Sequence, residues 1–149
     1  MTITFLGHSR IADPESVRKQ VEETLIKVCD PSEELRFYCG GYGDFDLLCA
    51  KACRSLKPFY PKSEIVLVIP YLEMPQRREP PKGLYDATVY PPLENVPLRF
   101  AISQRNKWMI READLIIAYV KSSGGAYTSF LYAERKKKIL NLAIEKDRA

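Results

Sequence analysis

The eight residues from Cys39 to Asp46, Cys-Gly-Gly-Tyr-Gly-Asp-Phe-Asp, constrain the fold of this chain more than any other stretch. A short β-prone run from Leu35 ends there in three glycines, and a helical pattern then begins. Glycine permits positive φ and close backbone approach, and Asp44 can cap a helix running to about Leu56. Such a turn presents backbone N–H groups and the positive end of a helix dipole to an anion. The stretch therefore predicts either a phosphate-binding turn or a purely structural turn between a strand and a helix.

Apolar runs and helical patterns alternate along the rest of the chain. The apolar run from Glu64 to Ile69 is nearly continuous, which indicates a strand buried on both faces. Strands are expected at 2–6, 35–39, 64–69, 114–120 and 138–142, and helices at 14–29, 44–56, 98–113 and 126–136. This alternation predicts an α/β protein: a Rossmann-like three-layer α/β/α sandwich with a mainly parallel sheet in the order 3-2-1-4-5.

Length and composition narrow the class of protein. A chain of 149 residues with 46% hydrophobic and 28% charged residues fits one domain spanning residues 1–149. No apolar run approaches the roughly 18 residues of a membrane helix, and the chain enters a strand directly after Met1, so we expect a cytoplasmic protein with no membrane partner. The four cysteines form no CxxC pair and the only histidine is His8, so we expect buried free thiols, no metal site and no cofactor. A net charge of +4 suits small anionic ligands and is too small to indicate nucleic acid.

Prolines concentrate in one region, because nine of the eleven lie between Pro58 and Pro97. The part from Pro70 to Pro97 is too long for an ordinary connection, and its aromatic residues need burial. We expect this Pro-rich excursion to be an ordered cover beside the ligand site or an interface. The run from Asp86 to Tyr90 is a candidate for an additional short strand.

Three turns between a strand and a helix are candidates for one shared site: Gly7 to Arg10, Gly40 to Asp46 and Ser122 to Thr128. In an open parallel sheet with right-handed crossovers, these loops all emerge at the carboxyl ends of the strands. The first and fourth strands would be neighbours at the topological switch point, where ligands bind in such folds. The candidate ligand-binding residues in these turns are Gly7, His8, Ser9, Arg10, Gly40, Gly41, Gly43, Asp44, Ser123, Gly124, Gly125 and Thr128. The helix starts, the hydroxyl groups and the charge of Arg10 all favour binding of an anion, so these turns predict a phosphate-bearing ligand.

These motifs also resemble a known group of proteins. Three motifs carry the resemblance through the order in which they follow one another: Gly7-His8-Ser9-Arg10, Gly40-Gly41-Tyr42-Gly43, and the stretch from Arg105 to Asp114 leading to Gly124-Gly125. In this order they resemble the YspA/YpsA-type branch of the SLOG superfamily, which is named after the SMF/DprA and lonely-guy proteins. The resemblance implies a Rossmann-like domain that binds a nucleotide or a nucleotide-derived ligand.

The lonely-guy phosphoribohydrolases of that superfamily split the N-glycosidic bond of nucleoside monophosphates. They carry an Arg-Lys-x-x-Met helix, matched here by Arg105 and Met109, and a Pro-Gly-Gly-x-Gly-Thr-x-x-Glu turn, matched in part by Gly124, Gly125 and Thr128. The resemblance implies that Arg105 contacts the ligand, but two apolar residues, Phe130 and Leu131, occupy the places where acidic residues would stand. Glu134, one helical turn further on, could replace that acid only if the helix start is shifted. Asp44, Asp46 and Glu73 are the other candidate acids.

Three functions remain open from the sequence. The first is a binding module for a nucleotide or nucleotide-derived phosphate ligand, with sensing as one role. The second is a hydrolase or transferase acting at the N-glycosidic bond of nucleoside monophosphates, with Arg105 and Glu134 as catalytic residues. The third is a non-catalytic interaction protein whose Pro-rich segment serves a partner or a second copy in a homo-oligomer. Tyr42 either stacks on a base or packs under that segment.

Overall fold

The computed structural model describes residues 1–72, 80–121 and 124–143. Its strands are β1 (Thr2–Gly7), β2 (Leu35–Cys39), β3 (Ser63–Val68), β4 (Ala87–Val89), β5 (Leu115–Tyr119) and β6 (Lys138–Asn141). Its helices are α1 (Pro14–Val28), α2 (Gly43–Leu56), α3 (Ala101–Glu112) and α4 (Gly125–Glu134), with short 3₁₀ turns η1 (Lys57–Phe59) and η2 (Leu98–Phe100).

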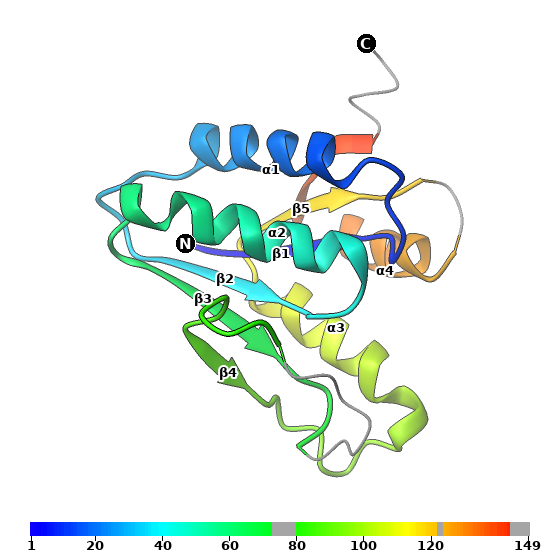
Figure 1. Ribbon diagram of the computed structural model, residues 1–149. Helices are drawn as coiled ribbons and strands as arrows, with labels where there is room; N and C mark the ends of the chain where they lie inside the picture. The colour runs from blue at the N-terminus through cyan, green and yellow to red at the C-terminus, as the bar shows by residue number, and fades with distance from the viewer. Residues whose placement is uncertain (73–79, 122–123, 144–149) are drawn as a thin grey trace.

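The six strands form one parallel sheet in the order β4-β3-β2-β1-β5-β6 (Figure 1). The predicted order 3-2-1-4-5 is confirmed, since the five predicted strands are β3, β2, β1, β5 and β6 in that sequence. The Rossmann-like α/β fold is therefore confirmed. The sixth strand, β4, lies at the sheet edge beyond β3 and falls within the predicted short strand of the Pro-rich excursion.

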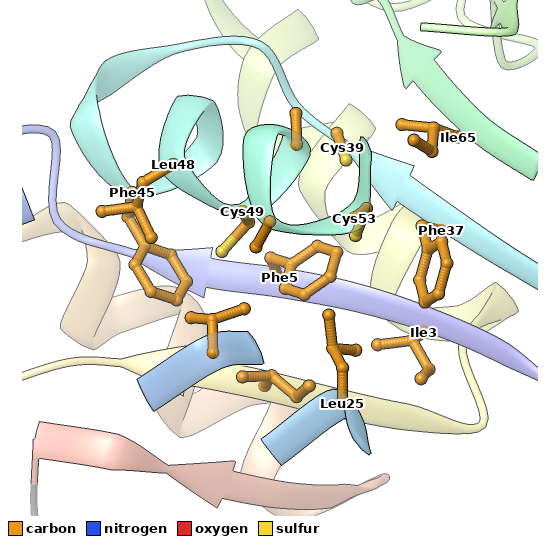
Figure 2. Packing of buried hydrophobic residues seen from close by; sticks show 14 of the residues in the cluster. Ile3, Phe5, Leu25, Phe37, Cys39, Phe45, Leu48, Cys49, Cys53 and Ile65 are labelled. Atoms are coloured by element: carbon orange, nitrogen blue, oxygen red, sulfur yellow. The ribbon is translucent and has the colours of Figure 1, made fainter. Parts of the chain in front are cut away.

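Helices cover both faces of the sheet. The face under α1 and α2 holds the larger core cluster, in which Val17, Val21 and Leu25 of α1 pack with Phe5 of β1 and Phe45 of α2 (Figure 2). A smaller cluster joins α3 and α4 to the other face. This is the three-layer arrangement that the spacing of the apolar residues predicts.

Local sequence signals explain where α1 begins. A side-chain oxygen of Asp13 accepts a hydrogen bond from the backbone N–H of Ser16 at 3.2 Å, and Pro14 occupies the first helical position. Such a proline costs no hydrogen bond, because the first N–H groups of a helix have no intrahelical partner. The predicted cap and proline are therefore both present.

The predicted cap of α2 is wrong. The helix begins at Gly43 with Tyr42 as its N-cap residue, and no side chain caps it there. Asp44 instead accepts a hydrogen bond from the backbone N–H of Ile11 at 2.8 Å, which fastens the loop after β1 to the start of α2. The physical reason is that Gly43 adopts a φ of 85°, which glycine does without strain, so the N-cap position falls at Tyr42, two residues before the predicted cap.

All four cysteines belong to the larger core cluster, where Cys49 and Cys53 lie on α2 and Cys39 lies beside it (Figure 2). All four are free and buried, as predicted. Burial raises the pKa of Cys29 to about 11 and those of the other three thiols as well, so these groups stay protonated at neutral pH. None of the helices in the described ranges is long and apolar enough to cross a membrane.

The described part of the Pro-rich excursion, residues 80–97, extends the sheet and is fixed to it through Asp86. The Asp86 carboxylate accepts hydrogen bonds from Arg54 at 2.9 Å, Lys57 at 2.6 Å and the backbone N–H of Ile65 at 2.8 Å. No residue of 80–97 lines the cavity at the carboxyl ends of β1 and β5, so this part does not form the cavity wall. Residues 73–79, including Glu73, lie outside the described ranges.

Candidate ligand-binding site

A cavity of about 570 Å³ opens at the carboxyl ends of β1 and β5. These strands are neighbours, and the chain leaves β1 to form β2 on the opposite side, so the cavity lies at the topological switch point of the sheet. Thr4, Phe5 and Leu6 of β1 contribute to its wall. Its volume falls within the roughly 300–1,000 Å³ typical of small-molecule sites.

Helix α3 contributes one continuous face to the cavity. The residues of this helix that line the cavity are Ile102, Arg105, Asn106, Met109 and Ile110. Their spacing of three and four residues places them on one side of a helix. The face therefore supplies apolar contact area together with a guanidinium and an amide.

The structure brings seven of the predicted ligand-binding residues to this cavity. They are Gly7, His8, Ser9, Arg10, Arg105, Gly124 and Gly125. Six other predicted site residues do not line it: Gly40, Gly41, Gly43, Asp44, Thr128 and Glu134. Ser123 lies outside the described ranges. The first and third turns therefore meet at the cavity, while the glycines of the second do not.

The N–H groups at the start of α2 are used by the protein itself. The backbone N–H of Asp44 donates to the Ser9 carbonyl at 2.9 Å, and that of Phe45 donates to the His8 carbonyl at 3.4 Å. The N–H of Tyr42 donates to a carboxylate oxygen of Asp46 at 3.0 Å. These donors are not available to an anion, so the prediction that this turn binds phosphate is not supported by the geometry.

The glycines of this turn allow close packing instead. A Cβ atom on Gly43 would lie 2.6 Å from the Cα of Ser9, and one on Gly41 would lie 2.6 Å from a methyl carbon of Leu67. Real Cβ contacts are longer, so a side chain at Gly43 would push the Ser9 backbone away, and one at Gly41 would displace the end of the Leu67 side chain. The alternative of a structural turn therefore describes this stretch.

The start of α4 has the opposite character. Apart from the adjoining chain and the helix backbone, no described residue places an atom within 4 Å of a Cβ built on Gly124 or Gly125, and both glycines line the cavity. The first intrahelical bond is donated by Thr128 to the Gly124 carbonyl at 3.3 Å, so the N–H groups of Gly125, Ala126 and Tyr127 have no partner within the helix. Helix starts of this kind bind anions through N–H groups and the helix dipole. Here α4 can do so from within the cavity.

Two basic residues of the loop after β1 lie near this helix start. Arg10 is exposed and lines the cavity, and it takes part in none of the ion pairs found among residues 1–72, 80–121 and 124–143. His8 accepts a hydrogen bond at Nε2 from the backbone N–H of Lys121, which follows β5. Burial and the charge of Lys121 hold the pKa of His8 below its usual value, so the ring is neutral and orients the loop.

Arg105 is buried, with 2% of its surface exposed. Its Nη1 donates to the carbonyls of Gly40 at 2.7 Å and Val68 at 2.8 Å, and its Nε donates to the side-chain oxygen of Asn106 at 2.9 Å. The Arg105 guanidinium also lies 5.3 Å from the ring centroid of Tyr42. Arg105 therefore fastens α3 to the ends of β2 and β3, in addition to lining the cavity.

Asp46, one of the candidate acids of the sequence, lines the cavity, and it is the only carboxylate among the described lining residues. Burial raises the pKa of its carboxyl to about 6, while the charge of Arg105 and the hydrogen bond from Tyr42 act in the opposite direction. At neutral pH the group is mostly ionised but close to titration. Its place three residues after Gly43, in the first turn of α2, is what made it a candidate in the sequence.

Glu134, the predicted acid, is exposed at the last residue of α4 and does not line the cavity. The cavity instead contains Asn106 and Ser129, which sequence reasoning did not select. Asn106 directly follows Arg105, and Ser129 lies one turn after Gly125, so helical spacing from the chosen residues is the signal that would have found them.

Comparisons with known proteins support the fold. No protein-family model matches the chain, and no curated protein matches it. Among solved structures, it is similar to the X-ray structure of TM1055, a structural genomics target, with 15% identity over 93% of this chain and 71% of that one, at a TM-score of 0.57. It is also similar to the Moco carrier protein of Chlamydomonas rheinhardtii, with 12% identity over 99% of this chain and 79% of that one, at a TM-score of 0.51. At these identities the likeness concerns the fold alone.

Proposed function

We propose that the cavity binds a nucleotide or a nucleotide-derived phosphate ligand and that the protein acts as a binding module, with sensing of that ligand as one role. The observation that carries this proposal is the start of α4, where Gly124 and Gly125 border open space in the cavity wall and the first N–H groups have no partner within the helix. A phosphate there would gain several N–H hydrogen bonds and a charge-assisted contact from Arg10.

The remainder of the cavity suits the non-phosphate part of such a ligand. Ile102 and Met109 of α3 offer apolar contact, and Tyr42 offers an aromatic ring that is 42% exposed at the cavity. A planar heterocycle gains free energy by stacking on such a ring. Tyr42 thus supports the stacking interpretation of the sequence without excluding other contacts.

Membership of the SLOG superfamily is part of this proposal. The motif order in the sequence and the Rossmann-like fold support it, and the similar fold of a protein named as a Moco carrier supports small-molecule binding. The fold by itself does not define a function, because related folds serve many unrelated ones.

Calorimetry with nucleoside monophosphates and inorganic phosphate tests the proposal. Gly125→Val should abolish binding, since its side chain would occupy the open space in front of the helix start. Arg10→Ala should weaken binding about tenfold or more, as loss of a charge-assisted hydrogen bond does. Arg135→Ala is the matched control, because Arg135 is an exposed arginine at the far end of α4. Affinity unchanged in both cavity variants would place the site elsewhere.

A second candidate function is hydrolysis or transfer at the N-glycosidic bond of nucleoside monophosphates. The position and raised pKa of Asp46 favour it, since departure of a base leaves positive charge on the ribose that a carboxylate can stabilise. Asp46 takes the place of Glu134 as the acid in this candidate. Free base released by the wild-type protein and not by Asp46→Asn would support catalysis, and no release from any nucleoside monophosphate would exclude it.

Self-association is the third candidate, and exposed apolar residues favour it. Leu98 is 75% exposed and Phe100 is 47% exposed at η2, beside the start of α3. A second copy of the chain packed there would bury this apolar surface. Light scattering after size exclusion distinguishes a monomer from a dimer, and Leu98→Ser should shift a dimer towards monomer.

A further inference from the structure

Asp46 is the only acidic side chain among the described residues that line the cavity. Its Oδ2 accepts the hydrogen bond from the Tyr42 N–H at 3.0 Å, and no other described residue donates to the carboxylate. An ionised carboxylate has two oxygens with about four acceptor positions. Most of its hydrogen-bonding capacity therefore remains available to a molecule in the cavity.

The two ends of the cavity have opposite preferences. The start of α4, which follows β5, favours an anion, whereas Asp46, on the first turn of α2 after β2, repels one and favours hydrogen-bond donors. Because β1 separates β2 from β5, the two ends are about two strand spacings apart, roughly 10 Å. A ligand that satisfies both ends must carry an anionic group at one end and donors further along.

The nearby guanidinium decides which donors fit. Asp46 and Arg105 both pack against Gly40, where a Cβ would lie 2.9 Å from Asp46 Oδ2 and 3.4 Å from Arg105 Cζ. The charge of Arg105 partly compensates that of Asp46. A neutral donor such as a hydroxyl then forms a strong hydrogen bond with the carboxylate, while a second cation would meet the repulsion of Arg105.

We propose that Asp46 accepts hydrogen bonds from the vicinal hydroxyls of a sugar phosphate whose phosphate group lies at the start of α4. The proposal rests on the proposed function and adds to it a class of ligand: sugar phosphates that keep both hydroxyls, in preference to deoxy sugars. Asp46 is then a specificity-determining residue, and the glycines at Gly124 and Gly125 serve the phosphate alone.

A purely structural role for Asp46, holding the Tyr42 N–H, is separable by mutation. Asp46→Asn keeps a side-chain oxygen for that N–H and removes the negative charge. Asp44→Asn is the matched control, because Asp44 lies two residues away on the same helix turn, accepts a backbone hydrogen bond from Ile11 and does not line the cavity.

The test compares ribose 5-phosphate, 2-deoxyribose 5-phosphate and inorganic phosphate by calorimetry at about pH 7.5, with circular dichroism confirming that each variant is folded. The wild type should bind ribose 5-phosphate about tenfold more tightly than its deoxy analogue, as expected for one charge-assisted hydrogen bond. Asp46→Asn should bind the two sugars equally and inorganic phosphate at least as well as the wild type. Asp44→Asn should keep the tenfold preference.

The outcomes distinguish this inference from the proposed function. Two results would overturn the inference and leave the phosphate site intact. One is that the wild type binds inorganic phosphate and binds both sugar phosphates equally well. The other is that Asp46→Asn still prefers ribose 5-phosphate to its deoxy analogue. No binding of inorganic phosphate or of either sugar would contradict the proposed function, and the sugar specificity with it.

Discussion

The Nε2 atom of His8 accepts a hydrogen bond from the backbone N–H of Lys121 at 2.8 Å, and this contact joins the loops that follow β1 and β5. A histidine accepts through Nε2 only when the ring is neutral and carries its proton on Nδ1. The two loops that border the cavity are therefore joined only in the deprotonated state of His8.

Loss of this contact should lower stability in a pH-dependent way. At about pH 8, His8→Ala should reduce the free energy of unfolding by about 1 kcal/mol, the usual value of one hydrogen bond. The pKa of His8 is lower in the folded protein than its usual value of 6.5, so the contribution is full above that pH and declines as the pH falls below it. Urea denaturation of both proteins at about pH 8 and pH 5 measures this. A difference between wild type and variant that does not shrink at pH 5 would contradict the assignment.

Arg105→Ala should mainly destabilise the fold. The change removes the donors to the buried carbonyls of Gly40 and Val68, and each unsatisfied acceptor costs about 1–3 kcal/mol. We expect a loss of about 2–4 kcal/mol in urea denaturation, whereas the exposed Arg10→Ala should stay within about 0.5 kcal/mol of the wild type. Wild-type stability in Arg105→Ala would show that its hydrogen bonds contribute little to the fold.

Two glycines of the cavity should respond differently to alanine. A Cβ on Gly7 would lie 2.3 Å from a ring carbon of Phe45 in the core, while a Cβ on Gly125 would meet no described residue packed within 4 Å. Overpacking of a core costs about 1–3 kcal/mol, so Gly7→Ala should lower the melting temperature clearly and Gly125→Ala should not. Differential scanning calorimetry of the two variants provides the comparison, and equal melting temperatures would be the contrary result.

Asp86→Asn should loosen residues 80–97. Although burial opposes ionisation, hydrogen bonds from Lys57, the Ile65 N–H and Arg54 lower the pKa of Asp86 to about 2. Its contribution is therefore full above the unfolded-state pKa of about 3.8 and is lost as the pH falls through about 2. We expect Asp86→Asn to lose about 1–2 kcal/mol at neutral pH, measured by urea denaturation, and faster amide hydrogen exchange in β4. Exchange in β4 that is unchanged would show that strand pairing alone holds this segment.

The sequence by itself determined the architecture. Apolar runs such as that from Glu64 to Ile69 and the helical spacing of Val17, Val21 and Leu25 predict which segments become strands and helices, since these patterns reflect the one face or two faces that each element must bury. Right-handed connections between parallel strands then place the loops after β1 and β5 at the same edge. The location of a cavity near Gly7 and Gly124 could therefore be predicted without coordinates.

Only the tertiary structure decided which of the glycine turns is open. The turns at Gly43 and Gly124 both have positive φ and both start a helix, so their local sequences predict the same anion-binding property. The carbonyls of His8 and Ser9 accept hydrogen bonds from N–H groups at the start of α2, whereas no described residue packs within 4 Å of the Cβ positions at the start of α4. Whether a helix start faces a neighbouring loop or a cavity depends on segments distant in sequence, and so does the burial of Asp46, which local spacing does not encode.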